Sequence, residues 1–227
     1  MSTAPETPVA SLVNFGIPTF ATPMALFQYL DTVSERYGLI RNMVAVVQRM
    51  DSEVLREVES PLFPKEALDF YSRFNLLQLD LSSPNTADQA LMAKYYNPER
   101  GGAQGDYRDG ILPKIDNLVD CLTKFPHSKR AVITIPFSSK GTCLADHTET
   151  GEAKCLRELH FYLEENEGPS STTEKSLCCS GFMRAQAVSI FPKNIHMIGR
   201  LMELVAGRLG WKVGSYTHFV TTLVKER

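Results

Sequence analysis

The sequence predicts an α+β fold in which N-terminal helices pack on a mixed β-sheet and a long buried helix lies near the C-terminus. The first half carries apolar residues at helical spacing, whereas the half after Lys129 alternates with the period of two that is typical of strands. The amphipathic stretch NIHMIGRLMELVAGRLG then precedes the last strand. The chain of 227 residues has no repeat and no clear linker, so we expect one domain over residues 1–227, with residues 1–8 frayed.

Start and stop signals define the helices of the first half. Thr22 and Pro23 are typical of an N-cap and a first helical position, and this helix either continues through QRM or breaks near Gly38. Two further helices are expected from Pro64 to about Leu77 and over residues 87–96, the latter ended by an Asn-Pro pair.

A glycine-rich loop, ERGGAQGDYRDG, leads into the last helix of this half. The segment ILPKIDNLVDCLTKF is amphipathic, and one face carries Ile115, Leu118, Val119 and Leu122. We therefore expect this helix to pack on the sheet that follows.

Four strands are expected after this helix. They are KRAVITIPF, CLRELHFYLEE, SLCCSGFMRAQA and the terminal YTHFVTTLV. Between the last two, a helix presents a continuous apolar stripe made of Ile195, Ile198, Met202, Val205 and Leu209, and Gly210 ends it.

Composition excludes several classes of protein. A net charge of −2 argues against a protein that coats nucleic acid, since such proteins neutralise many phosphates. No apolar run is long enough to span a membrane, and the N-terminus lacks the regions of a signal peptide, so a cytoplasmic location is expected. The five cysteines suit a reducing compartment. Cys143, His147 and Cys155 lack the second close pair of a structural zinc site, so no metal is predicted.

Cys155 begins one of the predicted strands. Alternation places it on the same face as Arg157, and a neighbouring cation favours the reactive thiolate. Leu156, Glu158 and His160 then point to the other face, so a base for this thiol must come from elsewhere in the fold. The alternative is a small buried side chain at a strand end.

The segment FMRAQAVSIFPKNIH combines a strand end with a helix entrance. Arg184 at such a position suits an anion site, since a guanidinium and the backbone N–H groups of a helix start both bind anions. Asn194 is either a ligand contact or the N-cap of the helix.

Taken in order, these segments resemble the thymidylate synthase superfamily, which includes the pyrimidine-nucleotide hydroxymethylases. The resemblance covers about residues 107–222 and consists of the IDNL helix, the KRAVIT strand, the cysteine-led strand ending HFYL, the arginine strand, the Phe-Pro-x-Asn-Ile turn and the LMELVAGRLGWKVG helix before YTHFV. It implies a thymidylate-synthase-like fold.

The resemblance also implies roles for residues of this chain. Cys155 matches the nucleophile, whose thiolate adds to C6 of a pyrimidine so that C5 can attack a one-carbon unit from 5,10-methylenetetrahydrofolate. Arg184 matches a phosphate-binding arginine, and Asn194 matches the residue that reads the pyrimidine edge. Lys129 and Arg130 match a basic pair that reaches the partner subunit's phosphate, which implies a homodimer with shared active sites. The alternative for these two residues is a solvated strand start.

Other candidates follow less directly from the same resemblance. Gln186 and His218 are candidate substrate contacts beside the matched arginine and in the terminal strand. Further candidates are Arg157, Glu66 as the glutamate that organises water, and Asp116 and Asn117 in the IDNL helix.

The chain departs from the family at its sugar and phosphate contacts. Arg184 and Asn194 are ten positions apart, one fewer than is usual, and no aspartate follows Gln186. After His218 the chain reads FVTTLVKER, which lacks the family's ribose-binding His-x-Tyr. These losses favour methyl or hydroxymethyl transfer to another pyrimidine nucleotide or related heterocycle, in specialised metabolism rather than dTMP synthesis. The alternatives are a folate-independent reaction at Cys155 and a non-catalytic dimeric binding protein.

Overall fold

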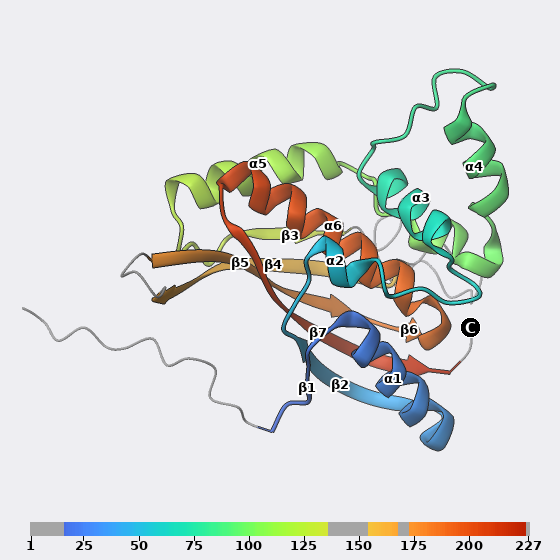
Figure 1. Cartoon of the computed structure of the whole chain (residues 1–227), viewed down its shortest axis with the longest axis horizontal. Coiled ribbons are helices and arrows are strands. Elements are labelled where there is room, and N and C mark those ends of the chain that lie inside the picture. The colour runs from blue at the N-terminus through green and yellow to red at the C-terminus, as the bar shows by residue number, and fades with distance from the viewer. Residues whose placement is uncertain (1–15, 136–153, 168–172, 226–227) are drawn as a thin grey trace, which may run out of the picture.

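A mixed seven-stranded sheet forms the centre of the computed structural model, which describes residues 16–135, 154–167 and 173–225 (Figure 1). Its strands are β1 (Thr19–Phe20), β2 (Ile40–Val47), β3 (Val132–Thr134), β4 (Leu156–Glu167), β5 (Thr173–Met183), β6 (Gln186–Ala187) and β7 (Lys212–Val224). The order is β1-β2-β7-β5-β4-β3, with β6 paired to β7. The β5–β7, β6–β7 and β1–β2 pairs are parallel and the others antiparallel, so the sheet is mixed as predicted.

The helices gather around the longest of them, α6. They are α1 (Pro23–Tyr37), α2 (Ser52–Leu55), α3 (Lys65–Asn75), α4 (Ala87–Tyr95), α5 (Ile111–Lys124) and α6 (Phe191–Leu209). Short 3₁₀ turns lie at Pro98–Arg100, Gly102–Gly105 and Val188–Ile190. Helix α6 contacts α1, α2, α3 and α5 as well as strands β5 and β7. These helices therefore lie on one face of the sheet, where α1, α5 and α6 pack against strands and α3 packs on α6 (Figure 1).

The burial of α6 follows from its sequence. Ile195, Ile198, Met202 and Val205 are buried as predicted, whereas Leu209, the last member of the predicted stripe, is only half-buried; Gly210 ends the helix with φ +68°. A Cβ at Gly199 would lie 2.4 Å from a methyl carbon of Leu55, so this close approach to α2 requires glycine. Within the described ranges, no helix is long and apolar enough to cross a membrane.

The region after Gly38 decides between the two alternatives for the first helix. Helix α1 begins after the predicted cap, with the Thr22 side chain accepting from Ala25 N, and it ends at Tyr37. Gly38 has φ +70°, and the following β-branched residues form β2, which pairs antiparallel with β7. The expected order of helices first and sheet later is wrong here, because β2 joins the sheet from the helical half.

A β-bulge corrects the predicted faces of β4. Leu159, Phe161 and Leu163 are buried, as the alternation predicts, but Leu156 is buried too. The register shifts between Leu156 and Glu158, so one extra residue returns Leu156 to the core side. The bulge lies immediately after Cys155, and alternation alone therefore misplaces the start of this strand.

Candidate active site

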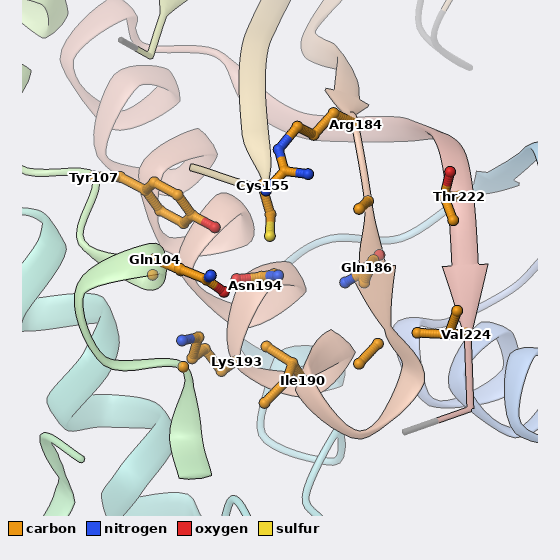
Figure 2. A pocket seen from close by; sticks show the side chains of 14 residues that line it. Gln104, Tyr107, Cys155, Arg184, Gln186, Ile190, Lys193, Asn194, Thr222 and Val224 are labelled. Atoms are coloured by element: carbon orange, nitrogen blue, oxygen red, sulfur yellow. The ribbon is translucent and has the colours of Figure 1, made fainter. Parts of the chain in front are cut away.

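A pocket of about 400 Å³ opens where β5 and β6 meet the start of α6 and the glycine-rich loop before α5. Its polar lining comprises Gln104, Tyr107, Cys155, Arg184, Gln186, Lys193, Asn194 and Thr222 (Figure 2). Ala187, Ile190 and Val224 add apolar surface. No aspartate or glutamate occurs among the described lining residues, whereas one arginine and one lysine do. The pocket thus suits a ligand that carries negative charge.

The β4–β5 pairing brings Cys155 and Arg184 together. Cys155 immediately precedes β4 and Arg184 immediately follows β5, and the Arg184 backbone N–H donates to the Cys155 carbonyl at 2.9 Å. The Arg184 Nε–H donates to the Lys154 carbonyl at 3.2 Å. The guanidinium is therefore positioned by the same strand ends that present the thiol (Figure 2).

Tyr107 lies beside this thiol and is almost fully buried. Burial raises the pKa of its phenol well above the ordinary value of 10, and the neighbouring Cys155 raises that pKa further. The backbone N–H of Tyr107 donates to Asn75 Oδ1 at 2.6 Å, which ties the glycine-rich loop to α3. Tyr107 consequently stays protonated at neutral pH and can act as a hydrogen-bond donor.

Lys193 forms a second wall of the pocket and is only 2% exposed. Its Nζ donates to the Arg100 carbonyl at 2.6 Å and lies 4.6 Å from the centre of the Tyr71 ring. A Cβ added at Gly101 or Gly105 would come within 2.3 or 2.2 Å of this Nζ. The glycine-rich loop can therefore wrap the ammonium because it lacks side chains at these two positions.

Two carboxamides in the pocket have polar atoms without hydrogen-bond partners. Gln186 in β6 and Asn194 in α6 are 3% and 4% exposed. Neither polar atom of the Gln186 amide has a partner, and neither does Asn194 Oδ1. Buried polar atoms are nearly always hydrogen-bonded in folded proteins, so these atoms mark a place where a ligand can supply the missing bonds.

The structure brings four of the predicted site residues to one pocket: Cys155, Arg184, Gln186 and Asn194. Asn194 is not the N-cap, because α6 begins at Phe191 and Ile190 precedes it. The helix starts earlier than its apolar stripe predicts, since Pro192 suits the first turn.

Other candidates lie outside the pocket lining. His218 is buried in β7, with Nδ1 at 3.2 Å from the Tyr216 hydroxyl, and burial lowers its pKa to about 4. Arg157 is the extra residue of the β4 bulge and does not line the pocket. Lys129 and Arg130 are exposed before β3, so they do not contribute to the pocket of their own chain.

The remaining candidates are surface residues engaged with other groups. Glu66 accepts hydrogen bonds from Lys94 and from the Tyr95 hydroxyl on the side of α3. Asp116 pairs with Arg208 at 2.8 Å, and Asn117 is exposed on α5. None of the three lines the pocket, so the structure does not identify a carboxylate that would organise water there.

Sequence reasoning missed Tyr107, Gln104 and Lys193 as pocket residues. The first two belong to the glycine-rich loop, which was predicted only as a connection, although its three closely spaced glycines indicate tight backbone packing. A lysine after a proline at a helix start gives no signal of burial.

The described residues contain no cluster of three potential metal ligands. Cys143 and His147, the pair weighed for zinc, lie outside the described residues.

Comparison with known proteins supports the fold. The chain is similar to the solved structure of a thermostable thymidylate synthase A from Bacillus subtilis, with a TM-score of 0.55, 11% identity, and coverage of 89% of this chain and 79% of that one. No protein-family model and no curated protein sequence matches. At this identity the similarity concerns the fold alone: the chain has a thymidylate-synthase-like α+β fold.

Proposed function

We propose that the pocket is the active site of a thymidylate-synthase-like one-carbon transferase with Cys155 as nucleophile. The observation that carries this proposal is that Cys155, Arg184 and Asn194, which come from the start of β4, the end of β5 and α6, line one pocket in a chain that folds like a thymidylate synthase. The proposed substrate is a pyrimidine nucleotide or a related heterocycle. The product carries a new methyl or hydroxymethyl group at C5.

Each pocket residue has a part in the proposed chemistry. The Cys155 thiolate adds to C6 of the ring, and the electron pair of the C5–C6 bond moves to C5, which becomes the nucleophile. The Arg184 guanidinium binds the phosphate, since it offers a fork of N–H donors next to the thiol. The buried Tyr107 hydroxyl donates a hydrogen bond near the reacting atoms and does not ionise at neutral pH.

The pocket also has a surface that fits a reduced folate. Ala187, Ile190 and Val224 provide apolar side chains on the β6 and β7 side, against which a flat pterin can pack. When bound, 5,10-methylenetetrahydrofolate supplies the one-carbon unit. The contribution of the chain is to stack this ring and to exclude water from C5.

Exchange of the C5 proton tests the nucleophile without folate. Addition of Cys155 to C6 makes C5 basic; C5 takes a deuteron from D₂O, and loss of the original C5 proton with expulsion of the thiolate returns a deuterated nucleotide. We expect exchange with dUMP by the wild type, followed by NMR, and a loss of at least about 1,000-fold in Cys155→Ser. Cys121→Ser is the matched control, since Cys121 is also half-buried but lies on α5 outside the pocket.

The outcomes separate the parts of the proposal. Equal exchange in Cys155→Ser and wild type would contradict the nucleophile. Exchange that depends on Cys155, without a heavier product when methylenetetrahydrofolate is added, would contradict one-carbon transfer and favour the folate-independent alternative.

A homodimer belongs to the same proposal. The sheet face away from α6 carries the neighbours Glu158, Phe182, Phe219 and Val44 in one row across four strands. The Phe182 and Phe219 rings stack with centroids 5.2 Å apart and are only half-buried. The described helices lie on the other face, so a second copy can cover these rings, and Lys129 and Arg130 would then extend to the partner's phosphate site.

Mixing two inactive variants tests the shared site. In a mixed dimer of Cys155→Ser and Arg130→Ala, one pocket combines an intact cysteine with an intact arginine from the other copy. Random mixing should then restore roughly a quarter of wild-type exchange, because half of the dimers are mixed and each has one complete site. The homodimer requires sedimentation at twice the chain mass, and a Phe219→Glu variant should sediment as a monomer. No restoration on mixing would contradict the shared site.

A further inference from the structure

The two carboxamides with unpartnered atoms carry information about the ligand that the thiol and the arginine do not. Gln186 and Asn194 come from different elements, β6 and α6, and both lie on the same side of the Cys155 thiol (Figure 2). Their side chains are buried and face a cavity. The described protein atoms leave three of their polar atoms without a bond.

The Gln186 amide is the more informative of the two. Its backbone is fixed by parallel pairing of β6 with β7, where Gln186 lies opposite Leu223. Neither its Nε2 nor its Oε1 has a partner, so the side chain offers one donor and one acceptor whichever way the amide is rotated. A purely accepting group such as a carboxylate can satisfy only the donor, and a purely donating group only the acceptor.

A cyclic amide edge satisfies both requirements. Its ring N–H donates to an amide oxygen of Gln186 or Asn194, and its adjacent C=O accepts from Gln186 Nε2. An apolar ring edge would leave all three protein atoms buried without bonds, which disfavours binding strongly.

We propose that Gln186 is a specificity-determining residue that reads the ligand ring together with Asn194 and restricts this pocket to rings with an uncharged cyclic amide edge. The inference rests on the proposed function, because it takes the ligand to be the heterocycle that Cys155 attacks. It goes further in assigning a second amide to the ring and in stating the chemistry of the ring edge.

The proposal predicts opposite effects on stability and on binding. Gln186→Met keeps the shape of the side chain and removes both unpartnered atoms, so the unliganded protein should melt about 2–4 °C higher. The same variant should bind dUMP roughly tenfold more weakly by calorimetry. Binding of 2-deoxyribose 5-phosphate, which lacks the ring, should not change.

Asn75→Leu is the matched control for a buried amide that has its bonds. Asn75 is 2% exposed, donates to the Tyr71 carbonyl at 3.0 Å and accepts from Tyr107 N. Its replacement should lower Tm by several degrees, roughly as the loss of two satisfied bonds predicts. Gln186→Leu provides a second variant at the test position if the methionine variant does not fold.

The ligand series tests the ring edge itself. Wild-type protein should bind dUMP at least about tenfold more tightly than its N3-methyl derivative, in which the ring N–H is blocked. Equal binding of the two overturns the assigned edge. A fall in Tm for both Gln186 variants as large as that for Asn75→Leu also overturns the inference, since the amide would then have bonds in the unliganded protein.

The inference on Gln186 and the proposed function can be contradicted by different results. If Gln186→Met binds dUMP as the wild type does while C5 exchange still depends on Cys155, the inference on Gln186 is wrong and the proposed function stands. If wild-type protein binds no pyrimidine nucleotide at millimolar concentration, both are wrong.

Discussion

Asn194 and His196 lie two residues apart on α6 and are both buried, yet only the histidine has a hydrogen-bond partner for the atom in question. His196 Nδ1 lies 2.7 Å from the Ser72 hydroxyl across the interface between α3 and α6. Asn75, which is also on α3, is bonded through both ends of its amide. Asn194 Oδ1, on the side of α6 that faces the pocket, has no partner.

The difference separates polar groups that stabilise the fold through internal hydrogen bonds from polar groups whose bonds a ligand can supply. A buried polar atom without a bond costs about 1–3 kcal/mol of stability, so the bonded side of α6 contributes to folding and the pocket side reduces it. Such a cost is typical of functional sites, where local rules of stability are broken and the rest of the core compensates. Substitutions on the two sides of α6 should therefore change the free energy of unfolding with opposite signs.

Acid should have the largest effect on stability, and it should act through His196 on the bonded side of α6 and through His218 in β7. Burial lowers the pKa of His196 and of His218 from 6.5 to about 4, and Arg200 also lowers that of His196. The unfolded chain therefore binds more protons between pH 6.5 and 4, and stability falls as the pH drops through this window. Each histidine should account for about 3 kcal/mol of that fall.

Urea unfolding at pH 7, 5.5 and 4.5 measures this loss. His218→Phe should flatten the dependence by roughly half, because only His196 then titrates in the window. A curve for His218→Phe as steep as that of the wild type would show that His218 accepts its proton in the folded state near pH 6.5.

Single substitutions on the two sides should come next in size and should differ in sign. Ser72→Ala removes the partner of a buried imidazole nitrogen and should lower the free energy of unfolding by about 1–3 kcal/mol. Asn194→Leu removes an unpartnered oxygen, so it should leave the free energy of unfolding equal or higher while weakening nucleotide binding. Urea unfolding and calorimetry on the same two proteins measure both effects. Equal destabilisation by the two substitutions would contradict the claim that only the bonded side of α6 stabilises the fold.

Much of the fold could be predicted because its signals are local. The cap at Thr22, the stripe on α6 and the stop at Gly210 are each encoded within a few residues, and the structure has all three. β2 was ambiguous because its identity depends on pairing with β7, which lies far away in the sequence. The β4 bulge gives no sequence signal at all, and it changes the face of Leu156.

The pocket could be predicted only in part for a related reason. Cys155, Arg184 and Asn194 were identified from the order of segments in a resemblance. Tyr107 and Lys193 reach the pocket through the fold of the glycine-rich loop, and the burial of Lys193 depends on the lack of side chains opposite its ammonium. Such tertiary contacts leave no periodicity in the sequence.

Substitution of an exposed residue at the rim of the pocket should have the smallest effect on stability and binding. Such a residue can be compared with the buried amides. Arg41 is exposed at the start of β2, and its Nη1–H donates to Thr222 Oγ1, a pocket residue, at 2.6 Å. Because an exposed charge is screened by water and salt, Arg41→Met should change the free energy of unfolding by less than about 0.5 kcal/mol. It should weaken dUMP binding about threefold at low salt, through reduced attraction of the phosphate, and this difference should vanish near 0.5 M salt. A loss that persists at high salt would instead place Arg41 in direct contact with the ligand, so that the anion-binding part of the pocket would extend from Arg184 across the end of β7.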